Sequence, residues 1–406
     1  MFFGWKVVGG AAVAQLFVIG FFSYTFSLLV MPLREEFGAS LEQVMYSMTL
    51  CTLVGLFISP LAGAMIDRYP VRWLMIGGAS IYAAGVWLLA QVGSINAFIL
   101  IFAIFVGLGN AFVGPMPANA TISRWFTASR GKALGFAAIG TSVGGMLLPV
   151  LFTWWITDFG WRAALENFAI TIVLVLIPIL WWTIYGKPED RGLQAEGFSD
   201  QTSTPVPDEH VLQASDILRQ PAFWLIAVSL GLLLSTYGAI LANVTPYALS
   251  LGRSEAQASS LLMTIAVAGL TGKIIFGMAA DKFSLKFGLG IAHALVAVGF
   301  VMLSTKPGYA GMLVACTAMG LAAGGMLPVW AAMLAQVFGV SSFGRAMGMM
   351  APVITLIVMP SFVIVGRIVD STGSYTLLLQ GFAVVLVVAI FLLLPLRMGR
   401  AGFSDS

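Results

Sequence analysis

Long apolar segments alternate with short polar connections along nearly the whole chain. Each segment has at least about 18 residues, and about 20 residues in a helix, at 1.5 Å rise each, cross a hydrocarbon core of about 30 Å. The pattern therefore predicts an all-α protein with twelve transmembrane helices, at residues 7–31, 44–66, 73–91, 97–122, 133–157, 163–185, 223–250, 256–280, 287–304, 309–338, 346–369 and 375–396.

Composition agrees with a multi-pass membrane protein. The 406 residues are 59% hydrophobic and 9% charged, whereas soluble domains carry roughly 25% charged residues. With both termini in the cytoplasm, 14 of the 20 Lys and Arg fall on the cytoplasmic side, five fall outside, and Lys273 lies within a span. This bias follows the positive-inside rule, so the net charge of +3 does not indicate a nucleic-acid partner. We expect a bacterial cytoplasmic (inner) membrane and contact with membrane lipid.

One long polar stretch, rich in Pro, Ser and acidic residues, divides the spans into two sets of six. It cannot bury enough apolar surface to fold alone and is expected to be a cytoplasmic linker. The predicted organisation is an N-terminal six-helix bundle at 1–185, a linker at 186–220, a C-terminal six-helix bundle at 221–398 and a tail at 399–406.

A spaced motif in the loop after the second span recurs after the eighth span, 214 residues later. The two copies are Gly63, Asp67, Arg68 and Arg72, and Gly277, Asp281, Lys282 and Lys286. This repeat indicates a parallel internal duplication, in which two bundles related by an axis along the membrane normal enclose a midplane site. Acidic and basic side chains at helix ends can close one face of such a protein, so we interpret the six charged residues as a cytoplasmic gate. The alternative is that they only anchor loops among lipid head groups.

The repeated motif resembles the G-x-x-x-D-[RK]-x-G-x-[RK] loop of the major facilitator superfamily, and the resemblance extends over essentially the whole chain. Both copies depart from that pattern at the inner glycine, which is Pro70 in one and Ser284 in the other. The resemblance implies two six-helix bundles and transport by alternating access.

Four further segments resemble the monocarboxylate-porter and oxalate:formate-antiporter branch of that superfamily. They are G-W-K-V-V at 4–8, P-E-D-R-G-L at 188–193, L-R-Q-P-A-F-W at 218–224 and G-R-I-V-D-S-T-G-S-Y at 366–375. The branch implies a cation in the eighth span that binds the substrate carboxylate. Here that position is Lys273, where an arginine is usual, and Gly269 stands where proton-coupled eukaryotic members resemble one another in having an aspartate.

Lys273 also attracts attention without the resemblance. It lies within an apolar span that contains no acidic residue. A lysine in a span costs roughly 2.5 to 3.5 kcal/mol on insertion scales and normally faces a bundle interior or a wet cavity. The alternative is that its stem extends toward the cytoplasmic interface, since Asp281 is only eight residues, about 12 Å, further along a helix.

Other polar and aromatic residues at similar depth are candidates to complete a substrate pocket, because amides and phenols donate to a carboxylate without adding charge. These are Tyr24, Asn110, Asn119, Tyr237, Asn243 and Trp330. For each of them, a hydrogen bond between helices or a core aromatic packing role is an equal alternative.

The sequence therefore predicts a secondary active transporter of a small organic anion, most simply a monocarboxylate, in which Lys273 binds the carboxylate. Coupling to H⁺ symport and exchange against another anion both stay open, as do dicarboxylate, aromatic-acid and neutral substrates on the same fold, and more remotely a non-transporting membrane sensor. A membrane enzyme would need paired carboxylates, a metal cluster or a nucleophile with its base, and the sequence pattern offers none. We expect no cofactor, no metal and, with the oligomeric state open, a monomer.

Overall fold

The computed structural model describes residues 2–197, 212–279, 284–339 and 342–396. Regular structure within these ranges is helical, and the one pairing of β type is an isolated bridge between Phe126 and Glu196. The first part of the chain contains α1 (Gly4–Ile19), η1 (Gly20–Thr25), α2 (Phe26–Phe37), α3 (Leu41–Arg68), α4 (Val71–Ala90), α5 (Ile95–Ile101), η2 (Phe102–Val106), α6 (Gly107–Val113), α7 (Pro115–Trp125), α8 (Arg130–Thr171), η3 (Ile172–Leu176), α9 (Ile177–Thr183) and the 3₁₀ turn η4 (Pro188–Arg191).

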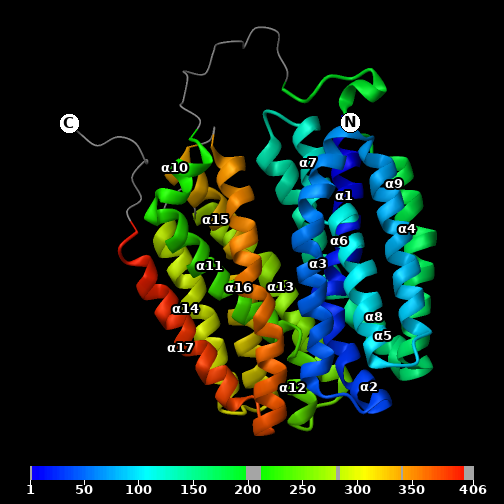
Figure 1. Ribbon diagram of the computed structural model, residues 1–406, viewed down its shortest axis with the longest axis vertical. Coiled ribbons are helices and arrows are strands. Elements are labelled where there is room, and N and C mark those ends of the chain that lie inside the picture. The colour runs from blue at the N-terminus through cyan, green and yellow to red at the C-terminus, as the bar shows by residue number, and fades with distance from the viewer. Residues whose placement is uncertain (1, 198–211, 280–283, 340–341, 397–406) are drawn as a thin grey trace. The chain divides into compact units, whose positions relative to one another are not determined.

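The described helices of the second part have no π-helical interruptions (Figure 1). They are α10 (Ala214–Arg219), α11 (Pro221–Leu241), α12 (Val244–Ser250), α13 (Glu255–Ala279), α14 (Leu285–Ser304), α15 (Tyr309–Phe338), α16 (Phe343–Thr372) and α17 (Thr376–Leu393). In the first part, by contrast, η1, η2 and η3 are π-helical turns inside otherwise continuous spans.

Eleven segments of the described chain are long and apolar enough to cross a membrane. One of them, Arg130–Thr183, has 54 residues, far more than one crossing needs. It is broken at Gly160, whose backbone has φ 85° and ψ 162°, a conformation essentially restricted to glycine. The break falls between the predicted fifth and sixth spans, so the eleven segments are consistent with the twelve predicted crossings.

The described chain separates into two units. The first comprises described residues within 1–202 and 241–263, and the second those within 203–240 and 264–406. In the first unit α12 packs on α2, where the Thr245 backbone N–H donates to Ser27 Oγ over 2.8 Å. Segment 241–263 thus lies with residues of the first six predicted spans, although the chain order places it after the linker. The domain boundaries drawn from the sequence stay a prediction.

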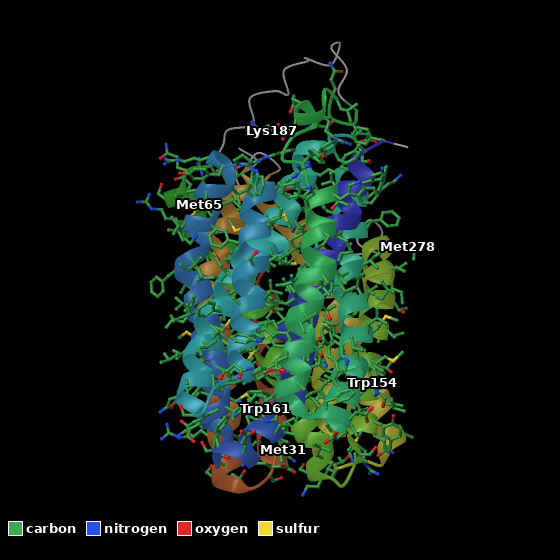
Figure 2. The ribbon with its side chains drawn as sticks, turned by 90° about the vertical axis from the view of Figure 1, so that its right-hand side faces the viewer. Met31, Met65, Trp154, Trp161, Lys187 and Met278 are labelled. Carbon is green, nitrogen blue, oxygen red and sulfur yellow. The ribbon has the colours of Figure 1, made fainter. Side chains whose placement is uncertain are left out.

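One end of the first unit, which we call the linker end, gathers aromatic and basic side chains. Figure 2 places Met65 and Lys187 toward this end and Met31 and Trp161 toward the other. Here the Trp125 indole donates to the Tyr185 carbonyl over 2.8 Å. The Arg191 guanidinium packs against the rings of both Phe3 and Tyr185, at 4.1 and 4.5 Å from their centroids. These contacts hold the start of α1, the end of α7 and the end of α9 together with η4.

At the opposite end of the first unit, Arg162 connects several elements. Arg162 follows the break at Gly160, and its Nη2 lies 2.6 Å from Glu36 Oε1 and 2.7 Å from the Val92 carbonyl. The Trp161 indole donates to the other Glu36 oxygen over 2.6 Å. The three residues thereby join the end of α2 to the residues after α4 and to the second half of α8.

The core of the second unit forms where α14 packs on α15 and α17. This core contains a polar residue, His293, which is fully buried. The Nδ1 atom of His293 lies 2.8 Å from the Leu289 carbonyl, and Nε2 lies 3.0 Å from the Ser229 carbonyl and 3.1 Å from Ser229 Oγ. The imidazole thus has partners at both nitrogens, on α11 and on its own helix.

Candidate functional site

Lys273 lies on the inward face of α13 in the second unit. Helical spacing places it in line with Gly269 and Phe276, four residues before and three after, and both are buried. The opposite face carries Ile275 and Met278, which are 49% and 63% exposed as expected for lipid-facing residues. Lys273 itself is half-buried. Its position on the helix therefore points away from the lipid-exposed stripe.

Glycines bring α13 and α15 into backbone contact beside Lys273. A Cβ atom on Gly324 of α15 would collide with the Gly269 carbonyl oxygen and the backbone nitrogen of Lys273. A Cβ on Gly272 would likewise collide with the Leu321 carbonyl. Small residues at such a crossing let two membrane helices approach closely. The backbone of Lys273 is thus held close against α15.

Tyr237 and Trp330 are the other predicted site residues in the second unit. Both are buried, on α11 and α15 respectively. The Trp330 indole nitrogen lies 3.2 Å from the Met350 sulfur on α16. A thioether is a weak acceptor, so this contact leaves the indole N–H able to exchange partners.

The remaining predicted pocket residues belong to the first unit and differ in burial. Tyr24 lies in the π-turn η1 and is half-buried, whereas Asn119 on α7 is exposed. Asn243, just before α12, is buried, and its amide nitrogen lies 3.3 Å from the Met45 sulfur on α3. Asn110 on α6 is half-buried, and its Oδ1 is a buried atom that accepts no hydrogen bond from the described residues.

Gln15 on α1 is a polar residue that the sequence reasoning missed. Only 3% of it is exposed, and among the described residues its Nε2 has no hydrogen-bond partner. A buried amide without a partner is unfavourable by about 1 to 3 kcal/mol and is therefore a candidate to contact a polar solute. The signal was available, since Gln15 is the one amide in the apolar segment at 7–31.

Asp67 of the first copy of the repeated motif forms an ion pair at the linker end. Asp67 Oδ1 lies 3.0 Å from Arg124 Nη2, and the same nitrogen donates to the Ile66 carbonyl over 3.1 Å. The Asp67 side chain is 80% exposed, so the pair contributes little to stability and can open readily. Arg124, at the end of α7, was not among the predicted gate residues. Arg68 is exposed beside the pair.

The last basic residue of each copy holds the end of a helix. Arg72 Nε donates to the Ile184 carbonyl after α9 over 2.6 Å, and its guanidinium stacks 3.6 Å above the Tyr185 ring. Lys286 Nζ donates to the carbonyls of Leu394 and Leu396 after α17, over 2.5 and 3.2 Å. Cations at helix C-termini are stabilising. The gate roles of Arg72 and Lys286 stay a prediction.

The other half of the predicted gate, Asp281 and Lys282, lies outside the described residues. The structure thus places the described candidate residues in two separate sets. Lys273, Tyr237, Trp330 and Lys286 belong to the second unit, and Tyr24, Asn110, Asn119, Asn243, Asp67, Arg68 and Arg72 belong to the first.

Comparisons with known proteins identify the family. The sequence model of the Major Facilitator Superfamily matches residues 11–252 and 232–404. Monocarboxylate transporter 11 of Homo sapiens is 25% identical over 98% of this chain and 85% of its own length. The agnestins efflux protein AgnL12 of Paecilomyces divaricatus is also 25% identical, over 82% of this chain and 73% of its own length.

A solved structure shows the same fold. The crystal structure of a bacterial homologue of the human lysosomal transporter Spinster, in an inward-facing and occupied conformation, aligns with a TM-score of 0.68 at 16% identity. The alignment covers 94% of each chain.

Proposed function

Because the chain belongs to the Major Facilitator Superfamily, it is a multi-pass membrane transporter and not an enzyme, and we propose that its substrate is a small organic anion, most simply a monocarboxylate. In this proposal the Lys273 ammonium binds the substrate carboxylate while the protein alternates between inward-open and outward-open states. The relatives named monocarboxylate transporter support this substrate class.

The observation that carries the proposal is the face of α13 on which Lys273 lies. Gly269, Gly272 and Gly324 press its backbone against α15, and the lipid-facing side chains stand on the opposite side of the helix. A lysine in a membrane span costs free energy of insertion and typically marks a substrate or ion path. A lysine offers a point charge with three rotatable donors, which suits small carboxylates of differing shape.

Coupling and substrate size stay open within this proposal. Gly269 provides no carboxyl group, so proton symport would need another titratable group, and exchange against a second anion would need none. The efflux proteins among the relatives favour export of a metabolite as the second candidate. A monomer in a bacterial cytoplasmic membrane is part of the proposal, although the relatives named above come from a mammal and a fungus.

Uptake into proteoliposomes tests the proposal. The full chain is reconstituted and offered radiolabelled lactate, pyruvate, oxalate, benzoate and glycerol, with and without a pH gradient. Loss of a charged hydrogen bond of about 1.5 to 3 kcal/mol should weaken carboxylate binding about 10- to 150-fold in Lys273→Ala. Lys273→Arg should retain most of the binding.

The matched control is Lys132→Ala, which removes an exposed lysine at the start of α8 and should leave uptake unchanged. Unaltered carboxylate uptake by Lys273→Ala would remove the binding role. Uptake of glycerol in preference to every acid would overturn the substrate class. Abolition of uptake when the pH gradient collapses would assign symport.

A further inference from the structure

The segment L-R-Q-P-A-F-W at 218–224 has no part in the proposed transport mechanism. In the structure it forms the corner between the short helix α10 and α11. Ile217 and Phe223 anchor the corner, since both are fully buried and the Phe223 ring meets the Phe338 ring of α15 edge-on, 6.5 Å between centroids. The buried anchors leave the residues between and after them on the outside of the bundle.

Contacts to α16 fix the start of α10 in the second unit. The Leu212 backbone N–H donates to Ser342 Oγ over 2.9 Å, and Arg345 Nη1 donates to the Leu212 carbonyl over 2.6 Å. The corner is therefore held at both ends, by α16 at its beginning and by Phe223 at its end. A rigid corner can present a defined surface to a ligand.

The outer surface of the corner combines one cation with an exposed aromatic ring. Trp224 is 46% exposed, and its indole N–H donates to the Leu218 carbonyl over 2.9 Å, which orients the ring over the corner. Arg219 is exposed beside it. Among the described residues, none forms a hydrogen bond or an ion pair with the Arg219 guanidinium. The guanidinium carries five N–H donors.

A cavity of about 630 Å³ opens between this corner and the end of α17. Figure 1 shows α10 and α11 beside the red end of the chain, where α17 finishes. Leu225 and Leu392 line the cavity with Trp224, and Arg219 is the one charged residue among its described lining. The cavity thus has a cationic rim and an apolar floor that continues along α11 and α17.

These features match the chemistry of a lipid at the membrane surface. Exposed tryptophan marks the interface between head groups and acyl chains, and a guanidinium binds a phosphate through parallel hydrogen bonds. A free phosphate would gain nothing from the apolar floor. We propose that this corner binds an anionic glycerophospholipid, with its phosphate on Arg219 and its acyl chain along Leu225 and Leu392.

Binding of fluorescent short-chain phosphatidylglycerol and phosphatidylcholine to the purified full-length protein in detergent tests this site. A basic residue near an anionic membrane surface contributes about 1 kcal/mol, so Arg219→Gln should weaken phosphatidylglycerol binding about fivefold. Arg219→Lys should lose less. Phosphatidylcholine binding should change little in either variant, and Trp224→Leu should weaken the binding of both lipids.

The control is Lys132→Gln, which removes one positive charge from an exposed position in the first unit and should leave both lipids unaffected. An equal loss of phosphatidylglycerol binding in Lys132→Gln would show a nonspecific charge effect and overturn the site. So would an undiminished preference for phosphatidylglycerol in Arg219→Gln. Competition by glycerol 3-phosphate at the concentration at which phosphatidylglycerol binds would show a soluble-anion site instead. Thermal unfolding of each variant at the wild-type temperature confirms that the fold is intact.

Discussion

Replacing Gly324 by alanine tests whether the α13–α15 crossing positions Lys273. The added methyl group would meet the Gly269 carbonyl oxygen, the Gly272 carbonyl carbon and the Lys273 nitrogen, all of them backbone atoms. None of these can rotate away as a side chain would, so the helices must separate, by about 1 Å. A gap of about 0.5 to 1 Å already loses a quarter to a half of the dispersion energy between the atoms involved.

The expected free-energy change follows from two opposing effects. Overpacking typically destabilises by about 1 to 3 kcal/mol, whereas alanine gains about 1 kcal/mol over glycine in a helix. Gly348→Ala on α16 is the matched control, because a Cβ at that position meets nothing within 4 Å and gains the helical preference alone. Gly324→Ala should therefore be less stable than Gly348→Ala by about 1 to 3 kcal/mol.

Thermal unfolding in detergent, monitored by size-exclusion chromatography, measures this difference in stability. At about 2 to 4 °C per kcal/mol for a unit of this size, Gly324→Ala should unfold several degrees below Gly348→Ala. Carboxylate uptake by Gly324→Ala should show a raised KM, because the separation moves Lys273. A Gly324→Ala protein as stable as Gly348→Ala, with unchanged KM, would refute the role assigned to this crossing.

Two further predictions concern the helix ends. Gly160→Ala should destabilise the protein by about 1 to 3 kcal/mol, because a side chain strains a backbone with φ 85°, even though a Cβ there meets nothing within 4 Å. Thermal unfolding measures the change. An unchanged melting temperature would show that a side chain does not strain the backbone at the break. Lys286→Gln should lower the melting temperature, by an amount equivalent to about 1 kcal/mol, through loss of the cation at the end of α17. A changed transport rate with an unchanged melting temperature would instead show that Lys286 acts in the gate and not as a helix cap.

The sequence predicted the helices and the family because both depend on local patterns: apolar segments of span length and short motifs with fixed spacing. The break near 160 was predicted from a short polar interval, and the structure places it at Gly160. For Lys273 the sequence predicted an inward face, because a lysine in a span normally faces a bundle interior, but it left open the alternative that the stem extends toward the interface. Lipid and a bundle interior are equally apolar, so the pattern along α13 could not decide between the two. The predicted role as a carboxylate ligand stays a prediction.

Partners distant in sequence were also beyond the reach of pattern reasoning. The repeat identified Asp67, but its partner Arg124 lies 57 residues away. Arg72 and Lys286 were recognised as repeated charges, yet each contacts backbone carbonyls, which every residue possesses and no side-chain pattern encodes. Gln15 was visible as a lone amide, although only the packing around it shows that its nitrogen is unsatisfied.

The π-turns η1, η2 and η3 have a consequence for evolutionary comparison. Such a turn accommodates one additional residue in a helix, which rotates every later side chain by about 100° relative to an uninterrupted span. In comparison with a relative whose span lacks the turn, equivalences along α2, α6 and α9 must therefore be counted from the far end of each span, beyond η1, η2 and η3. Aligned columns that ignore this offset would assign ancestral positions to the wrong side of the helix.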